Sequence, residues 1–128
     1  MTDLTTLPLL DPSPMAELWQ ASPSRAARLL GFYLEDLPGQ ISGILTALQT
    51  RNAAQIGDIA HSLKSSSRQM GALKLGEAAY RVEQAARSNP PDPYLPQFVQ
   101  SLSGLVPATI SAVTQQLNTH KQPESQPA

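Results

Sequence analysis

A single histidine in the middle of the chain, His61, lies in a segment whose apolar and small residues recur with helical spacing. At about 100° per residue, these residues share one side of a helix, and His61 points almost directly away from them. They are Ile56, Ile59, Ala60, Leu63, Ser67 and Met70. We therefore expect the imidazole on the exposed face, where its neighbours are two small residues and two cations. These neighbours are Gly57, Ser65, Lys64 and Arg68.

An exposed imidazole beside cations suits an anionic group carried by another macromolecule, because small neighbours let the partner's backbone approach. A phosphoryl group is the natural candidate, since neutral imidazole is a good nucleophile at physiological pH. Lys64, one helical turn beyond His61, can place its ammonium beside phosphoryl oxygens. Residues 60–87 hold five Lys and Arg against two Glu, whereas the whole chain has a net charge of −1, so the basic character is local.

Other interpretations of the same residues carry less weight. Without the residues around it, His61 would be interpreted as a surface histidine that has no functional role. A metal site shared with Asp58 is disfavoured, because no second histidine lies on that face and the nearby cations repel a metal ion, so we expect no metal site. His120 is expected to be solvated and without function. The sequence has no Walker-type loop, no Gly-x-Gly-x-x-Gly and no acidic Mg²⁺ cluster, so we expect no ATP binding and no autokinase activity.

Composition limits the chain to one small domain. It has 128 residues, 41% of them hydrophobic, and no cysteine, which excludes disulfides, thiolate catalysis and Cys-ligated metals. The net charge of −1 predicts no non-specific binding to nucleic acid or to an anionic membrane. No apolar run approaches the roughly 20 residues of a membrane span, and residues 1–10 lack the Lys or Arg of a signal peptide. We expect a cytoplasmic location.

Proline spacing and apolar periodicity predict the elements that position His61. The 12 prolines leave residues 39–89 free, and a helix interior tolerates proline poorly. We expect helices at 12–20, 23–50, 53–70, 73–88 and 94–118, with a kink at Pro38 and Gly39, a terminator at Gly71 and a bend at Pro107. Met15, Leu29, Phe32, Leu63, Met70 and Leu75 are assigned to the core.

No segment alternates like a half-buried strand, so the predicted fold class is all-α. Short loops predict an antiparallel up-and-down four-helix bundle, with the short N-terminal helix as a lid. We divide the chain into a lead-in at 1–10, a helical bundle domain at 11–118 and a polar tail at 119–128, which is expected to be disordered. Since no apolar stripe is left over once the bundle closes, we expect a monomer.

The residues around His61 resemble a known family. The run from His61 to Ala72 reads HSLKSSSRQMGA, and it is followed by Leu75, Ala79 and the run from Val82 to Arg87, VEQAAR. This pattern is similar to the histidine-containing phosphotransfer (HPt) domain of multistep two-component phosphorelays, in which His, any residue, Leu, Lys, a small residue and Ser are followed by a closing Gly-Ala or Gly-Leu. The resemblance extends over about residues 11–118.

Carried over residue by residue, the resemblance implies that His61 accepts the phosphoryl group and that Lys64 stabilises it. Glu83 matches a position whose side chain approaches the histidine. There it would accept a hydrogen bond from Nδ1 of His61 and leave Nε2 free to attack the phosphoryl group. Ser65 differs from the glycine that is most common at its position in the family, and its side chain slightly narrows the access of a partner beside His61. Gly57, Ser65 and Arg68 are assigned to the docking surface.

The resemblance also implies partners and a mechanism. A response-regulator receiver domain would donate the phosphoryl group from its aspartate and supply Mg²⁺, a second receiver would accept the group, and a hybrid sensor histidine kinase is a further candidate partner. The chain would need no cofactor of its own. The alternative is a non-catalytic helical adaptor that binds a receiver or kinase domain without phosphotransfer. A free-standing shuttle and the last domain of a hybrid kinase both fit the residues.

Overall fold

The computed structural model describes the backbone of residues 3–125 and the side chains of residues 3–120. All regular secondary structure in this part of the chain is helical. Five α-helices follow a short 3₁₀ helix. The elements are η1 (Leu4–Thr6), α1 (Ser13–Ala21), α2 (Pro23–Gln49), α3 (Ala53–Met70), α4 (Leu73–Arg87) and α5 (Leu95–Ser125). The predicted all-α class is confirmed.

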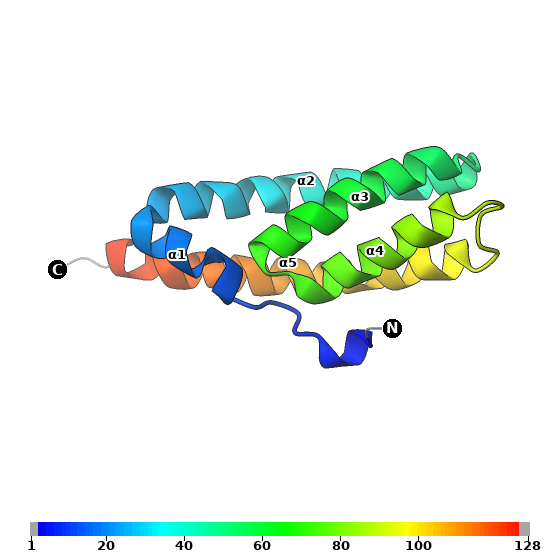
Figure 1. Cartoon of the computed structure of the whole chain (residues 1–128). Coiled ribbons are helices and arrows are strands. Elements are labelled where there is room, and N and C mark those ends of the chain that lie inside the picture. The colour runs from blue at the N-terminus through cyan, green and yellow to red at the C-terminus, as the bar shows by residue number, and fades with distance from the viewer. Residues whose placement is uncertain (1–2, 126–128) are drawn as a thin grey trace.

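The four long helices form an antiparallel bundle (Figure 1). Helix α2 packs on α3, α3 on α4, α4 on α5 and α5 back on α2, so the bundle closes around one core. Helix α1 packs against α2 and α3, and η1 lies against α4. The predicted up-and-down four-helix bundle with an additional short N-terminal helix is therefore confirmed.

The helix that carries His61 has well-defined ends. At its start, the Asn52 side chain accepts a hydrogen bond from the Gln55 backbone N–H at 3.1 Å. At its end, Gly71 has φ = 88°, and the N–H of Ala72 donates to the carbonyl of Ser67 at 2.8 Å. A Cβ on Gly71 would collide with the backbone oxygen of Asp11, so only glycine fits this turn. The predicted terminator is confirmed.

Helices α2 and α5 run through Pro38 and Pro107, the positions where a kink and a bend are expected. The end of α5 differs from expectation. Helix α5 continues past Asn118, its predicted end, to Ser125. The polar tail predicted from Thr119 is therefore helical as far as Ser125, and residues 126–128 lie outside the described residues. The imidazole of His120 stacks on the indole of Trp19 in α1, with ring centroids 3.8 Å apart, which extends the packing of α5 beyond its apolar stripe.

The core follows the periodicity with one exception. Met15, Leu63, Met70 and Leu75 are buried, and Leu29 packs against the core. Phe32, assigned to the core, is instead 52% exposed. The inward positions of α2 follow steps of three and four residues, and Tyr33 takes the place next to Phe32. They are Ala26, Leu30, Tyr33, Leu37, Ile41, Ile44 and Ala47.

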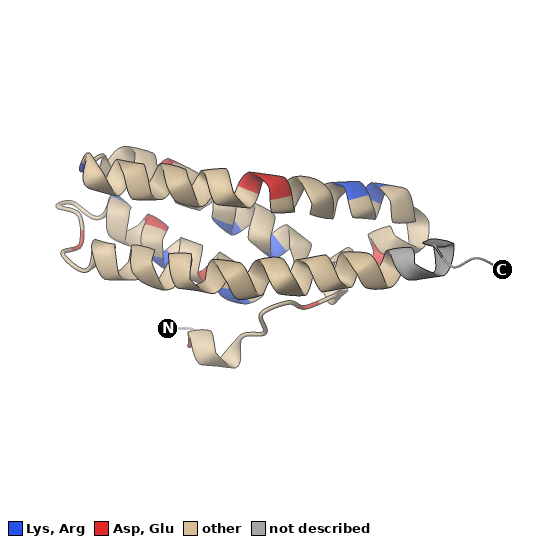
Figure 2. Ribbon diagram, turned by 180° about the vertical axis from the view of Figure 1, so that it is seen from behind, with Lys and Arg blue, Asp and Glu red and all other residues tan. Residues whose placement is uncertain are grey.

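Charge is distributed unevenly over the bundle. Residues 95–120 of α5 include no Lys, Arg, Asp or Glu, and the α5 ribbon is uncharged over this length when the molecule is seen from behind (Figure 2). The five cations of residues 60–87 belong to α3 and α4. None of the helices within residues 3–125 combines the length and apolar character that a membrane crossing requires.

Candidate functional site

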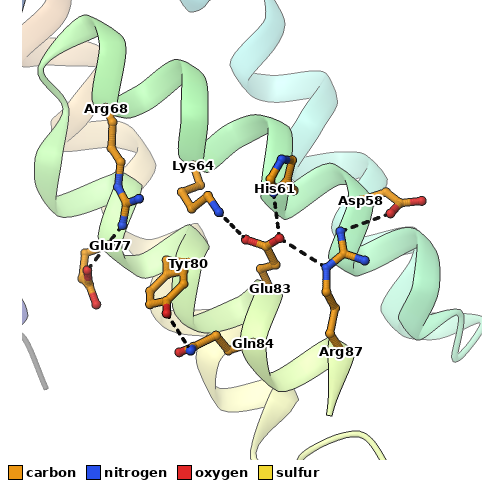
Figure 3. A network of polar contacts seen from close by, with 9 residues as sticks. All are labelled: Asp58, His61, Lys64, Arg68, Glu77, Tyr80, Glu83, Gln84 and Arg87. Carbon is orange, nitrogen blue, oxygen red and sulfur yellow. Dashed lines mark hydrogen bonds and ion pairs between the residues drawn. The ribbon is translucent and has the colours of Figure 1, made fainter. Parts of the chain in front are cut away.

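Helix α3 presents His61 to solvent, and α4 fixes one edge of its ring. The side chain is 56% exposed, and Nδ1 lies 2.8 Å from Oε2 of Glu83 (Figure 3). Because an ionised carboxylate only accepts hydrogen bonds, this contact favours the tautomer with the proton on Nδ1. Nε2, on the edge of the ring directed away from Glu83, then keeps its lone pair.

Glu83 is the centre of the network. Its side chain is only 10% exposed, and its carboxylate accepts hydrogen bonds from three side chains on two helices. Besides His61, Nζ of Lys64 lies 2.8 Å from Oε1, and Nε of Arg87 lies 3.2 Å from Oε2. Partial burial by itself raises the pKa of the Glu83 carboxyl, but hydrogen bonds from Lys64, His61 and Arg87 together hold that pKa below its ordinary value.

Lys64 lies near His61, but its ammonium faces Glu83 and not Nε2. It is held between that carboxylate and the ring of Tyr80, whose centroid is 5.4 Å from Nζ. Arg68 approaches the same ring at 5.4 Å, and the Tyr80 hydroxyl accepts from the Gln84 amide at 2.7 Å. Contact of Lys64 with a group on Nε2 therefore requires its flexible side chain to turn.

The predicted docking residues fall into two groups. Ser65 is exposed, and Arg68 lies on the same open face, where it pairs with Glu77 at 3.8 Å. Gly57, in contrast, is buried and offers no open surface, because the side chain of Arg87 covers it. A Cβ on Gly57 would lie only 3.2 Å from Cγ of Arg87. The expectation that Gly57 lies on the exposed face beside His61 is therefore wrong.

Arg87 is the site residue that sequence reasoning missed. Besides its contact with Glu83, its Nη2 lies 3.3 Å from Oδ1 of Asp58 on α3. The available signal was the spacing of Glu83 and Arg87, which are four residues apart and so lie on one face of a helix.

The described side chains bring together no group of three or more His, Asp and Glu that could hold a metal ion. Asp58, the second ligand considered for a metal at His61, pairs with Arg87 instead. The site thus consists of an exposed imidazole whose inner edge is fixed by a buried carboxylate and whose outer edge is open.

Comparisons with known proteins find solved structures with a similar fold. The crystal structure of histidine-containing phosphotransfer protein B (HptB) from Pseudomonas aeruginosa PAO1 is similar, with a TM-score of 0.80, 23% identity, and coverage of 88% of this chain and 96% of that one. The HPT domain from the Hpt sensor hybrid histidine kinase of Shewanella has a TM-score of 0.72 and 24% identity, covering 91% and 97% of the two chains.

At these identities the solved structures establish the fold. The chain matches none of the curated proteins compared with it. The family model for the Hpt domain, however, matches residues 28–122, which is most of the chain and includes all of α3 and α4. The protein therefore belongs to the Hpt domain family.

Proposed function

We propose that His61 is the phosphoryl carrier of a phosphorelay intermediate, which takes the group from the aspartyl phosphate of one receiver domain and passes it to the aspartate of another. Membership of the Hpt family supports a histidine phosphotransfer role in phosphorelays. The observation that carries the assignment to this residue is the 2.8 Å contact between Nδ1 of His61 and buried Glu83, which leaves the exposed Nε2 as the nucleophile.

The transfer step uses Nε2 and the aspartyl phosphate. The lone pair of Nε2 attacks phosphorus, the N–P bond forms as the P–O bond to the aspartate breaks, and the bonding electron pair returns to the aspartate carboxylate. The ring gains positive charge as it bonds to phosphorus, and the Glu83 carboxylate stabilises that charge through the Nδ1 proton. Because the same atoms serve in both directions, the transfer is reversible.

Lys64 has a separate role in this proposal. Its ammonium leaves the Glu83 carboxylate and turns toward the phosphoryl oxygens, where it offsets their negative charge. The partner receiver supplies the Mg²⁺ ion, and the chain needs no cofactor of its own. Since the sequence lacks a nucleotide-binding loop, the phosphoryl group comes from another phosphoprotein and not from ATP.

The partners in this proposal are response-regulator receiver domains, with a hybrid sensor histidine kinase as a further candidate, and the protein acts as a monomer in the cytoplasm. Ser65 and Arg68, exposed beside His61, contribute to the surface on which a receiver docks. Serine at position 65 is small enough to let the receiver's backbone approach.

Phosphoryl transfer from a labelled receiver tests the proposal. The protein is mixed with a ³²P-phosphorylated receiver domain in the presence of Mg²⁺, and the label on each protein is followed by gel electrophoresis. We expect acid-labile, alkali-stable label on the wild type and none on His61→Gln. A wild type that binds receivers without taking label from any of them is instead an adaptor, and the proposal is then wrong.

A further inference from the structure

We infer that Arg87 is a positioning residue for phosphoryl transfer: its guanidinium ties Glu83 to α3 and keeps this carboxylate on Nδ1 of His61 when Lys64 leaves for the phosphoryl group. The inference rests on the proposed role of His61 as phosphoryl carrier. It assigns a function to a side chain that the sequence motif did not single out.

The first observation is how the Glu83 oxygens are shared. Oε2 accepts from both His61 and Arg87, whereas Oε1 accepts from Lys64 (Figure 3). Lys64 can therefore leave without disturbing the oxygen that holds the imidazole. Arg87 remains as the second donor to that oxygen and fixes its position relative to Nδ1.

The second observation is the fit between Arg87 and α3. The guanidinium and its stem lie over Gly57, where a Cβ would be 3.2 Å from Cγ and 3.3 Å from Cζ. The absence of a side chain at Gly57 thus provides the space that Arg87 occupies. At the residue that follows Gly57 in the sequence, Nη2 donates to Oδ1 of Asp58 at 3.3 Å. The guanidinium of Arg87 is in this way supported from α3 as well as from α4.

Charge explains why the second cation is needed. A phosphoryl group on Nε2 brings negative charge close to Lys64 and draws its ammonium away from Glu83. A largely buried carboxylate that lost its only cationic partner would be costly to keep ionised. Arg87 removes that cost, so Glu83 stays ionised and continues to accept from Nδ1 while Lys64 serves the phosphoryl group.

The contact with Glu83 contributes more to this arrangement than the contact with Asp58. Arg87 is 47% exposed and Asp58 is 75% exposed, and exposed ion pairs contribute little. The informative variant is therefore Arg87→Gln, which removes both the positive charge and the N–H donors of the guanidinium. Arg87→Lys keeps the charge but lacks the planar guanidinium, whose separate N–H groups donate to Glu83 and to Asp58.

Two measurements on the isolated protein test the inference. The first is the tautomer ratio of unphosphorylated His61, read from long-range ¹H–¹⁵N correlation spectra. The second is the rate at which potassium phosphoramidate phosphorylates His61. In that reaction the bond between Nε2 and phosphorus forms, the P–N bond of the reagent breaks, and ammonia leaves, so no partner protein is required.

The matched control is Arg81→Gln, which removes the same charge from the same helix. Arg81 pairs with Glu77 at 3.4 Å, whereas the three donors to Glu83 described above are His61, Lys64 and Arg87. Circular dichroism at the assay temperature verifies that all variants remain folded.

We expect Arg87→Gln to lower the fraction of His61 protonated on Nδ1 and to slow phosphorylation about three- to tenfold, the effect expected for the loss of one typical hydrogen bond. Arg87→Lys should recover part of both, and Arg81→Gln should match the wild type. Wild-type tautomer ratio and rate in Arg87→Gln, or an equal loss in Arg81→Gln, would overturn the inference. If the wild type itself takes no phosphoryl group, the proposed function fails, and the tautomer ratio alone still decides whether Arg87 positions Glu83.

Discussion

At the scale of single residues, the site depends on one carboxylate. Glu83 accepts from His61, Lys64 and Arg87 at 2.8–3.2 Å. The motif around His61 was sufficient to predict the first of these contacts. The pairing of Lys64 with Glu83 and the covering of Gly57 by Arg87 depend on how α3 sits against α4, and helical periodicity within one helix contains no information about that register.

The lowered pKa of Glu83 predicts a pH-dependent contribution to stability. An acid whose pKa is lower in the folded state stabilises the fold above its unfolded pKa of about 4.5, and this stabilisation is lost as the pH falls through the folded pKa. We expect Glu83→Gln to lower the free energy of unfolding at pH 7 by about 1–3 kcal/mol. The difference from wild type should shrink below pH 4.5, as measured by urea denaturation across the pH range. A difference that is independent of pH contradicts this account.

Lys64 should matter for transfer and little for folding. We expect Lys64→Ala to slow phosphoryl transfer from a receiver or to shorten the lifetime of the phosphohistidine, because the ammonium no longer offsets the charge of the phosphoryl oxygens. Helix content by circular dichroism should be unchanged, since Arg87 still pairs with Glu83. Equal transfer rates and equal lifetimes in the two proteins would mean that Lys64 has no role in transfer.

At the scale of elements, local signals predicted helix starts and stops better than they predicted tertiary contacts. Gly71 ended α3 as expected, because its left-handed φ is a local property of the chain. The end of α5 was placed too early because the stacking of His120 on Trp19 joins residues a hundred positions apart. Phe32 was wrongly assigned to the core because Tyr33, its neighbour, is also apolar enough to fill the inward position.

The contact between Tyr33 and Ser67 joins α2 to α3 and gives a second prediction about pH. Their hydroxyl oxygens lie 2.7 Å apart in the core, and burial raises the pKa of Tyr33 from 10.0 to about 12, although the hydrogen bond with Ser67 opposes this. A folded pKa above the unfolded one gives stability that is complete below pH 10 and is lost as the pH rises toward 12.

We expect Tyr33→Phe to destabilise the protein by about 1 kcal/mol at pH 7, through loss of the hydrogen bond. Between pH 10 and pH 12 its stability should fall less than that of the wild type, as followed by thermal unfolding. A steeper alkaline loss in Tyr33→Phe than in the wild type would contradict the assignment.

At the scale of the whole molecule, charge is distributed unevenly among the helices of the bundle. Five cations lie on α3 and α4, whereas residues 95–120 of α5 are uncharged (Figure 2). The all-α class, the order of the helices and the closed bundle could be predicted from proline spacing and apolar periodicity, because both are properties of the whole sequence. The charge network between α3 and α4 required the packed structure.

This asymmetry predicts where a receiver docks. We expect Arg68→Gln to slow phosphoryl transfer from a receiver, because the cation that it removes lies on the exposed face of α3 that carries His61. Phosphorylation by phosphoramidate, which needs no docking, should change much less. The matched control is Gln97→Glu, which adds a negative charge at an exposed position of α5 and should leave both rates unchanged. Equal slowing of receiver transfer by the two variants would mean that net charge, and not the face of α3, controls docking.

The most direct test of the account is to identify the atom that carries the phosphoryl group. The protein is labelled with ¹⁵N, phosphorylated by a receiver or by phosphoramidate, and studied by ³¹P and long-range ¹H–¹⁵N NMR. We expect a single phosphorylated histidine, His61, with phosphorus bonded to Nε2 and the proton on Nδ1. Phosphorus on Nδ1 of His61, or on any other residue, would contradict the account.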